Sequence, residues 1–460
     1  MSENKGILGL EFKEFQEKIQ DGFLKISVIG LGRIGLPTAV AFARSNLLTT
    51  GVDINQEIVE SVNNGKLRIN DEPGLEEALQ KVINTKKFSA KTNIHESIGD
   101  ADIIIVCLPT PLENNSKKTN YEFLLKGCSD IAKSMKSNSL IIIESTVGPG
   151  IVENQVVPVL EKESGLIAGK DFGVASCPER ANPSTILTDF NKIPRVVGGI
   201  SDKSTKFAAK LYQFVFKIEV VSVKNCKTAN AVKVIENVFR DVNVAFINEI
   251  AVFCDRIGID VNELIKGCST KYNFIPHFPG PGVGGPCLPV NPYQLLDAPE
   301  SKDILQVVRT ARKINSEMPN YVIELLTDGL NEINKDSKNI SVGILGISYK
   351  PNVGDIQLTP IKEVIEKLKK MNFKIKIFDP FFINKDFCSI KTEDSFENTV
   401  SNCDVLILGT DHDEFLDMDY NKLKTLMNTS GIVIDTRGKL SASKIREVGL
   451  IFRGIGRIVK

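Results

Sequence analysis

The sequence has few of the side chains that build metal centres. Its 460 residues include only three histidines, His95, His277 and His412, which excludes a His-rich metal site. None of the nine cysteines form a C-x-x-C pair, so zinc knuckles and thioredoxin-like redox motifs are excluded as well. An odd number of scattered cysteines is typical of reduced thiols in a reducing compartment. We therefore expect no metal cofactor.

The sequence also lacks an excess of charge and long apolar runs. It has 57 basic and 57 acidic residues, and zero net charge gives no reason to expect a nucleic acid or an anionic membrane as partner. Because no run of about 18 apolar residues occurs, we expect no transmembrane helix. Residues 1–22 have neither the apolar core nor the cleavage pattern of a secretory signal peptide. These features predict a cytoplasmic protein.

What the sequence does contain is a pattern of short apolar runs that occurs twice. The first set is KISVIGLGRIG, TTGVDIN, ADIIIVCLPTP and SLIIIESTVGPG, and the second is NISVGILGISYK, FKIKIFDP, CDVLILGTDHDEF and GIVIDTRG. Such β-branched runs are typical of strands covered on both faces, and helices fit between them. We predict an α/β fold with two Rossmann-like, doubly wound parallel-sheet domains at 23–216 and 330–460. An N-terminal extension at 1–22 contains an amphipathic helix over 8–20.

The segment 217–329 between the two domains has a different pattern. Apolar residues recur at three- and four-residue spacing over 227–256 without Gly or Pro, which predicts one long helix. A loop rich in Gly and Pro follows, NFIPHFPGPGVGGPCLPVNPY, and a second helical stretch at about 301–335 leads into the last domain. We interpret this segment as a helical dimerisation domain.

A glycine-rich loop follows the first predicted strand and opens a helix. The first glycine of a G-x-G-x-x-G turn permits the tight bend, the second lets a pyrophosphate approach the backbone, and the third lets helix and strand pack closely. Asp53 ends the next strand, about 20 residues on, where a carboxylate binds the adenosine ribose and repels a 2′-phosphate. We therefore predict that the cofactor is NAD. The loop residues expected to bind it are Gly30, Gly32, Arg33, Ile34 and Gly35.

Two threonines follow the next strands of the same sheet. Thr110 lies in CLPTP and Thr146 in ESTVGPG, at the carboxyl edge where ligands bind in such sheets. Both are candidate cofactor or site hydroxyls. Capping of a following helix is an equally good interpretation of each threonine.

Cys287 lies in an unusual Gly/Pro loop, GVGGPCLPVNP. A cysteine beside a helix N-terminus is in a place that can lower the pKa of its thiol. The alternative is a small buried hydrophobic residue, which most cysteines are.

Taken together, the motifs GLGRIGLP, CLPTP, ESTVGPG, CPER, GVGGPCLP and SYKPNVGD, with a helix that carries Lys233 and Asn237, resemble one family in content and order. This is the family of nucleotide-sugar C6 dehydrogenases, which act on UDP-glucose, GDP-mannose or UDP-N-acetylhexosamines. The resemblance covers residues 23 to 460. It implies an N-terminal NAD-binding domain, a central helical dimerisation domain and a C-terminal UDP-binding domain.

The resemblance implies a four-electron oxidation of the sugar C6 hydroxyl to a carboxylate, with two NAD reduced. Cys287 is then the nucleophile that forms a thiohemiacetal and a thioester. Lys233 and Asn237, one helical turn apart, stabilise the developing alkoxide and the tetrahedral intermediates. Glu179 contacts substrate and does acid–base or water-activating work, and Thr146 orders a water.

Several residues depart from the family pattern. Asn291 stands where the family often has Asp, and an amide can orient a group but cannot accept a proton as a carboxylate does. Glu179 would then be the general base, or the role of Asn291 is structural. Gln357 replaces an arginine that commonly meets an NAD phosphate, and Gly148 stands where many members have Pro. Lys350 matches the family.

The sugar is expected to be an N-acetylhexosamine. Arg240-Asp241 in the helix, PGPGVGG before the cysteine and CPERANPS resemble that branch. Arg240 could donate to an N-acetyl carbonyl, and its alternative is an ion pair with Asp241 or a neighbouring acid. We favour UDP-N-acetyl-D-mannosamine, with UDP-N-acetylglucosamine and UDP-glucose as the alternatives.

Nine residues are expected to bind the substrate. They are Glu179, Arg180, Lys233, Asn237, Arg240, Lys271, Phe274, Gly284 and Lys350. His277, in the same loop region, is interpreted as a hydrogen-bonded loop histidine. A two-electron hydroxyacid-type dehydrogenase that uses Lys233 alone, or a dinucleotide-binding regulator without catalysis, would not need Cys287. The expected partners are a UDP-sugar and further copies of the chain, as a homodimer or a higher homo-oligomer.

Overall fold

The computed structural model describes residues 6–67, 72–113, 116–182, 185–333 and 339–457. Contacts divide the chain into two compact units: residues 1–236 with 293–301, and residues 237–292 with 302–460. We call them the first and the second unit and describe each by itself.

The first unit is built on an eight-stranded sheet in the order β3-β2-β1-β4-β5-β6-β7-β8. Strands β1 to β6 are parallel, and β7 runs antiparallel to β6 and pairs with β8 in parallel. The strands are β1 Lys25–Ile29, β2 Leu48–Val52, β3 Phe88–Lys91, β4 Ile103–Val106, β5 Leu140–Ile143, β6 Gly173–Ser176, β7 Arg195–Gly199 and β8 Val220–Val223.

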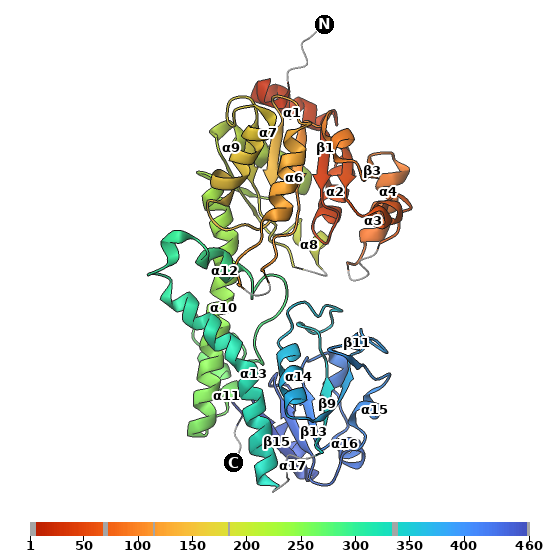
Figure 1. The fold of residues 1–460 in the computed structure, drawn as a ribbon, viewed down its shortest axis with the longest axis vertical. Coiled ribbons are helices and arrows are strands. Elements are labelled where there is room, and N and C mark those ends of the chain that lie inside the picture. The colour runs from red at the N-terminus through yellow and green to blue at the C-terminus, as the bar shows by residue number, and fades with distance from the viewer. Residues whose placement is uncertain (1–5, 68–71, 114–115, 183–184, 334–338, 458–460) are drawn as a thin grey trace. The chain divides into compact units, whose positions relative to one another are not determined.

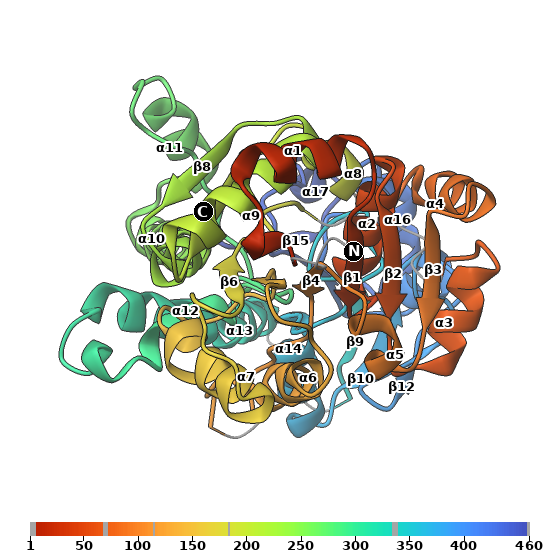
Figure 2. The same ribbon diagram turned by 90° about the horizontal axis from the view of Figure 1, so that it is seen from above.

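Helices cover both faces of this sheet. They are α1 Phe12–Gln20, α2 Gly35–Arg44, α3 Gln56–Asn63, α4 Leu75–Asn84, α5 Ile94–Ile98, α6 Glu122–Ala132, α7 Val157–Ser164, α8 Ile186–Asp189 and α9 Asp202–Phe216, with short helical turns at Ile7–Gly9 and Val152–Val156. Figure 2 shows α1 and α9 on one side of the strands and α6 and α7 on the other. Ile103 and Ile105 belong to the first core, and Ile104 and Val106 to the second. Continuous apolar runs thus supply both cores of a doubly wound sheet.

The second unit contains a five-stranded parallel sheet in the order β10-β9-β13-β14-β15, also covered on both faces. Its elements are β9 Ser341–Leu345, α14 Ile361–Lys370, β10 Lys374–Phe378, the β11–β12 hairpin at Asp386–Phe387 and Ile390–Lys391, α15 Phe396–Val400, β13 Val405–Leu408, a turn at Asp413–Phe415, α16 Tyr420–Leu426, β14 Ile432–Asp435, α17 Ala442–Glu447 and β15 Ile451–Gly454. The predicted fold class, two doubly wound sheets with helices between them in sequence, is confirmed.

The segment between the two sheets is helical, as Figure 1 shows in green and teal. Its elements are α10 Cys226–Ile257, α11 Val261–Cys268, α12 Asn291–Leu296, a short turn at Pro299–Ser301, and α13 Gln306–Glu332. The predicted helix over 227–256 is confirmed as α10. The stretch predicted at about 301–335 forms α13 over a shorter range, and the amphipathic helix predicted over 8–20 begins later, as α1. Among the described residues, no helix is both long and apolar enough to span a lipid bilayer.

Helix α10 exposes a stripe of apolar side chains and buries a stripe of polar ones among apolar residues such as Val234 and Ile247. Its exposed apolar residues recur at four- and seven-residue spacing along one stripe: Ile235, Phe239, Phe246, Phe253 and Ile257. Its buried polar residues recur at the same spacings along another: Asn230, Asn237, Asp241 and Asn248. A helix in water normally buries its apolar side. The polar stripe therefore needs internal hydrogen-bond partners, and the apolar stripe is an exposed patch of the kind that marks an interface.

Candidate active site

The glycine loop lies at the carboxyl end of β1 and leads into α2. Gly30 has φ +92°, and its N–H donates to the carbonyl of Val52 at 2.8 Å. A Cβ on Gly35 would lie 1.8 Å from the Gly30 carbonyl oxygen, so this position admits only glycine. A Cβ on Gly32, in contrast, would meet no described atom within 4 Å. The chain leaves space at the position where a pyrophosphate approaches the backbone and the helix N-terminus.

Asp53 follows β2 and faces this loop. Its Oδ2 accepts the Leu31 N–H at 2.9 Å and its Oδ1 accepts the Asn55 N–H at 2.9 Å. The carboxylate is only half-buried, and each of its oxygens can accept a second hydrogen bond. The predicted adenosine ribose contact therefore fits this geometry.

The second sheet has a carboxylate at the matching place, but its environment differs. Asp379 follows β10 and is buried, and its Oδ2 accepts the Ile347 and Ser348 N–H groups at 2.8 and 3.1 Å. His412 Nε2 lies 3.1 Å from the same oxygen. Burial opposes ionisation of Asp379, but the hydrogen bonds from His412 and from the backbone outweigh it and hold the pKa below its ordinary value. Because Asp379 is buried and bonded within the protein, it is not available to a ribose, and of the two doubly wound sheets described the first has the features of a dinucleotide site.

The two predicted threonines meet beside the first sheet. Thr110 Oγ1 donates to the carbonyl of Thr146 at 2.7 Å, and Gln294 Nε2 donates to the same carbonyl at 3.0 Å. The departure at Gly148 has a local reason. Its N–H donates to Tyr121 Oη at 3.0 Å, and a Cβ there would lie 2.7 Å from the Gln294 carbonyl oxygen. Proline would lose that donor and collide.

Beneath these loops lies a buried carboxyl group, Glu144. Its Oε1 accepts the Tyr212 hydroxyl at 2.5 Å, while its Oε2 accepts Thr38 Oγ1 at 3.2 Å and Cys107 Sγ at 3.3 Å. Burial raises the pKa of Glu144, and the nearby Arg195 opposes that rise. Burial likewise raises the pKa of the Cys107 thiol, with Glu144 as the second cause. A raised pKa favours the protonated thiol, which is a weaker nucleophile than the thiolate.

Glu179, predicted to act in catalysis, is 6% exposed at the carboxyl end of β6. Its Oε1 accepts the N–H groups of Arg180 and Ala181 at 2.6 Å each, and its Oε2 lies 2.5 Å from Arg195 Nη1. The Arg195 guanidinium is buried among aromatic rings, 4.8 Å from the ring centre of Phe190. Further rings, of Phe216 and Tyr212, lie at 4.7 and 5.6 Å. These contacts fix the orientation of Glu179.

The predicted substrate residue Arg180 is held by the chain itself. Its Nε donates to Glu236 Oε2 at 3.0 Å, its Nη2 contacts Glu236 Oε1, and its Nη1 donates to the Pro194 carbonyl at 2.6 Å. Glu236 lies on α10, three residues after Lys233. The pair therefore joins the CPER loop to the helix that carries the predicted catalytic lysine. As far as the structure describes the first unit, Lys233 itself forms no ion pair.

In the second unit, Cys287 is a half-buried free thiol. Its carbonyl accepts the N–H groups of Val290 and Asn291 at 3.1 and 2.8 Å, which places Cys287 at the turn that opens α12. Asn237 Nδ2 donates to Asn291 Oδ1 at 2.5 Å. The structure thus brings together three of the predicted catalytic residues, Asn237, Cys287 and Asn291.

Arg240 and Asp241 differ sharply in their surroundings. Asp241 is fully buried and pairs with Arg312 Nη1 at 2.6 Å, while Arg240 is exposed. Burial raises the pKa of Asp241, and Arg312 opposes that rise. The ion pair of Arg240 with Asp241 is wrong, because the buried carboxylate pairs with Arg312 of α13, while a pair of Arg240 with a neighbouring acid stays a prediction.

The remaining predicted residues lie in loops of the second unit. Lys271 is exposed, with its Nζ 5.6 Å from the ring centre of Tyr272, and Phe274 packs against the core of the second unit. Gly284 has no room for a Cβ, which would lie 2.7 Å from Tyr349 Cβ. Lys350 is exposed.

Two further predictions concern one loop in each unit. His277 Nδ1 lies 3.1 Å from the Ile275 carbonyl, which confirms its interpretation as a hydrogen-bonded loop histidine. The motif CPERANPS runs into residues 183–184, which lie outside the described residues.

Sequence reasoning missed three charged residues at these sheet edges: Glu144, Arg195 and Arg437. Arg437 follows β14, and its Nε donates to the Gly409 carbonyl at 2.9 Å, while its buried Nη2 has no hydrogen-bond partner among the described residues. Burial lowers the pKa of Arg437. The available signal was a charged residue directly beside an apolar strand, as in GIVIDTRG and IPRVVGG.

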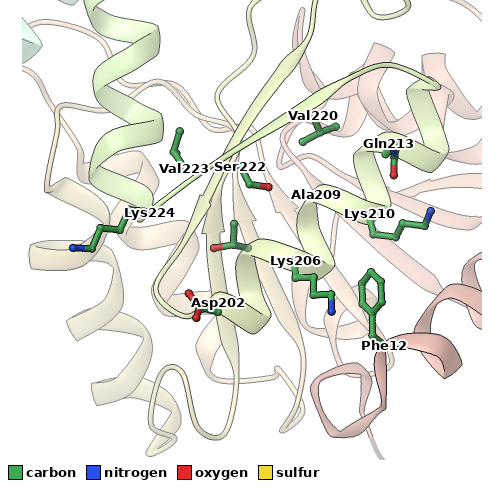
Figure 3. A pocket seen from close by; sticks show the side chains of 11 residues that line it. Phe12, Asp202, Lys206, Ala209, Lys210, Gln213, Val220, Ser222, Val223 and Lys224 are labelled. Atoms are coloured by element: carbon green, nitrogen blue, oxygen red, sulfur yellow. The ribbon is translucent and has the colours of Figure 1, made fainter.

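A separate groove of about 590 Å³ lies between α9 and the edge strand β8 (Figure 3). Lys206 lies on its wall, with its Nζ 4.1 Å from the ring centre of Phe12. None of the predicted site residues line this groove.

Comparisons with known proteins agree with this geometry. Three domain profiles of the UDP-glucose/GDP-mannose dehydrogenase family match the chain: the NAD binding domain at residues 24–216, the central domain at 227–317 and the UDP binding domain at 343–442. A UDP-N-acetyl-D-mannosamine dehydrogenase from Pyrococcus horikoshii is 35% identical over 434 residues, which cover 94% of this chain and 99% of that protein.

Solved structures give the same result. The UDP-D-ManNAc dehydrogenase structure from Pyrococcus horikoshii matches with a TM-score of 0.87 at 34% identity, over 94% of this chain and 99% of that chain. An NDP-N-acetyl-D-galactosaminuronic acid dehydrogenase from Methanosarcina mazei Go1 matches with a TM-score of 0.86 at 28% identity, over 96% and 98%.

Proposed function

Because the chain belongs to the UDP-glucose/GDP-mannose dehydrogenase family, we propose that it oxidises the C6 hydroxyl of UDP-N-acetyl-D-mannosamine to the carboxylate. The observation that carries this proposal is the likeness to the Pyrococcus horikoshii enzyme over 94% of the chain, with a cysteine in the GGPCLP loop. The enzyme is an NAD-dependent oxidoreductase.

The glycine loop, the N-terminus of α2 and Asp53 would hold NAD. When bound, NAD supplies the hydride acceptor for each of the two oxidations. Gly32 leaves the pyrophosphate room, and Asp53 has acceptor capacity for the ribose hydroxyls and repels a 2′-phosphate. Thr110 and Thr146 lie on the same edge of the first sheet as this loop and are proposed site hydroxyls.

The chain's own groups would carry the covalent chemistry. The Cys287 thiolate adds to the C6 aldehyde, and the new C–S bond gives a thiohemiacetal. Its oxidation gives a thioester, and water then attacks the acyl carbon, the C–S bond breaks, and the thiolate leaves. Lys233 and Asn237 would donate hydrogen bonds to the oxygen that gains negative charge in these steps. Overall, one C6 alcohol, two NAD and one water yield one carboxylate, two NADH and three protons.

Asn291 would act by orientation. Its amide oxygen accepts from Asn237, so it can fix the Asn237 amide toward the reacting oxygen. Since an amide does not accept a proton, we assign activation of the hydrolytic water to Glu179, whose orientation Arg195 holds.

The choice of sugar rests on the names of the relatives and on Arg240. This exposed guanidinium on α10 is free of Asp241 and could donate to an N-acetyl carbonyl. Lys271, Phe274, Gly284 and Lys350 are proposed to line the substrate site. Turnover of a panel of UDP-sugars with NAD tests this choice: UDP-N-acetyl-D-mannosamine should be the best substrate, and a preference for UDP-glucose would refute it.

The covalent step has its own test. We expect two NADH per sugar consumed, and C287S should lose most turnover while it binds NAD as the wild type does. One NADH per sugar consumed, or near-normal turnover by C287S, would refute the thioester mechanism.

We further propose a homodimer or higher homo-oligomer, with the apolar stripe of α10 at the interface. The five exposed apolar side chains along this helix support an interface there, because in a monomer they would be in contact with water. The domain boundaries at 217 and 330 remain predictions.

A further inference from the structure

The buried polar stripe of α10 continues beyond the residues used by the reaction. One turn after Asn237, the fully buried Asp241 carboxylate pairs with Arg312 of α13 at 2.6 Å. Asn315, one turn further along α13 than Arg312, donates from Nδ2 to Asp241 Oδ1 at 2.8 Å and to the Asp241 carbonyl at 2.9 Å. Asn248 Nδ2 donates in turn to Asn315 Oδ1 at 2.9 Å. These four side chains form one buried network between two helices.

This network ends on the loop that precedes Cys287. Asn248 Oδ1 accepts the buried N–H of Gly280 at 2.9 Å. Two residues later, the backbone at Gly282 passes so close to α13 that a Cβ there would lie 2.9 Å from the Asn315 carbonyl oxygen. Pro319, four residues after Asn315, has no N–H to give that carbonyl, so the helix leaves it open toward the loop.

From Gly282 onward the loop is held at short intervals. Gly285 N–H donates to the Gln357 carbonyl at 2.8 Å, and a Cβ on Gly285 would lie 2.7 Å from the Tyr349 ring. Cys287 follows two residues later, with its carbonyl bonded to Asn291 N–H. A glycine-rich segment has little stiffness of its own, so its path depends on such contacts.

We propose that Asn248 and Asn315, aligned by the Asp241–Arg312 pair, are positioning residues that set the path of the 280–285 loop and thereby the place of the Cys287 thiol. The inference rests on the proposed function, in which Cys287 is the nucleophile. A hydrogen-bonded network fixes the path of a loop better than apolar packing, because each hydrogen bond fixes one direction and one distance, whereas apolar contacts permit sliding. Asn248 is the decisive member, since its side chain links the network to the Gly280 N–H of the loop.

The test compares N248A with the control N320A in the full chain. Asn320 is an asparagine of α13 whose side-chain contact, to Glu317, is local and exposed. Turnover is measured with NAD and the UDP-sugar that the wild type uses best. In parallel, alkylation of each cysteine by iodoacetamide is followed by peptide mass spectrometry without substrates.

We expect N248A to lower kcat by about tenfold with KM changed less than about twofold, since the misplaced thiol affects chemistry more than binding. Cys287 should be alkylated about threefold faster or more, while the buried Cys254 and Cys403 of the same unit stay protected. N320A should match the wild type in both measurements. If N248A does not fold, N248S, which keeps a hydroxyl in the buried site, takes its place.

Wild-type kcat and Cys287 alkylation in N248A would overturn the inference. So would equal acceleration at Cys254, Cys403 and Cys287, because that pattern reports general opening of the unit. Failure of the proposed function gives a different pattern. If C287S keeps full turnover, Cys287 is not the nucleophile, while the alkylation rate of Cys287 still shows whether Asn248 holds the loop.

Discussion

One methyl group, added at either of two positions of the same loop, should separate folding from cofactor binding. At Gly35 the added Cβ would lie 1.8 Å from the Gly30 carbonyl oxygen and 3.1 Å from Cys107 Cβ, so backbone must move. At Gly32 it would meet no described atom within 4 Å, and the φ of Gly32 is not positive. G35A therefore perturbs the protein, and G32A perturbs only what binds to it.

The magnitudes follow from these distances. Overpacking of this severity costs about 3 kcal/mol, which lowers the Tm of G35A by roughly 5–10 °C. G32A should stay within about 0.5 kcal/mol of the wild type in stability. Its methyl group occupies the approach of the pyrophosphate, so NAD should bind at least about tenfold more weakly, a loss of about 1.4 kcal/mol.

Thermal unfolding with and without NAD measures both effects. At an NAD concentration of about 100 times the wild-type Kd, the ligand stabilises the wild type by about 2.7 kcal/mol. At the same concentration G32A should gain only about 1.4 kcal/mol or less. The reasoning is refuted if G32A gains as much from NAD as the wild type, or if G35A unfolds at the wild-type temperature.

Three further predictions concern other parts of the chain. R180E and E236R should each lower kcat, since the Arg180–Glu236 pair joins the CPER loop to α10. In a double-mutant cycle, the double variant should recover about 1 kcal/mol of the combined loss. Strict additivity of the two losses would show that the pair is not coupled. Asp255 lies on α10, where its Oδ2 accepts the Gly456 N–H at 2.9 Å and the Tyr321 hydroxyl. Burial raises the pKa of Asp255 to about 6, so the folded state binds this proton more tightly and stability falls as pH rises from about 4 to about 6. D255N should therefore be more stable than the wild type by roughly 1–2 kcal/mol at pH 7, with the gain gone near pH 4, and equal urea midpoints at both pH values would contradict this. F246D should shift the protein to a monomer in light scattering, and an unchanged mass would exclude the apolar stripe of α10 from the interface.

Much of the fold could be predicted because its signals are local. The runs IIIV and LIII are apolar without interruption, and they form β4 and β5, buried on both faces. The regular spacing over 227–256 gave α10 to within one residue at each end. The reversed direction of β7 could not be read, because strand direction depends on the connection across the sheet rather than on residues such as RVVGG.

The candidate site shows the same difference between local and long-range signals. Gly32, Asp53 and Cys287 could be nominated because their motifs are contiguous in sequence. The partners that hold the site could not, since they come from distant segments: Arg195 meets Glu179 across 16 residues, and Asn248 meets Gly280 across 32. Arg180 illustrates the limit. Its motif suggested a substrate contact, while the structure pairs it with Glu236, 56 residues later.

The buried Asp379 bears on attempts to redesign the cofactor preference of this chain. Two sheets of similar design suggest that glycine-loop residues could be transplanted from one to the other. Such a graft would fail in the second sheet, because Asp379 would remain engaged by His412 and by the Ile347 and Ser348 N–H groups. Freeing the carboxylate would break the contacts that shape the loop after β9. Each sheet is thus locked to one class of ligand by how its acid is used, although the acid itself is present in both.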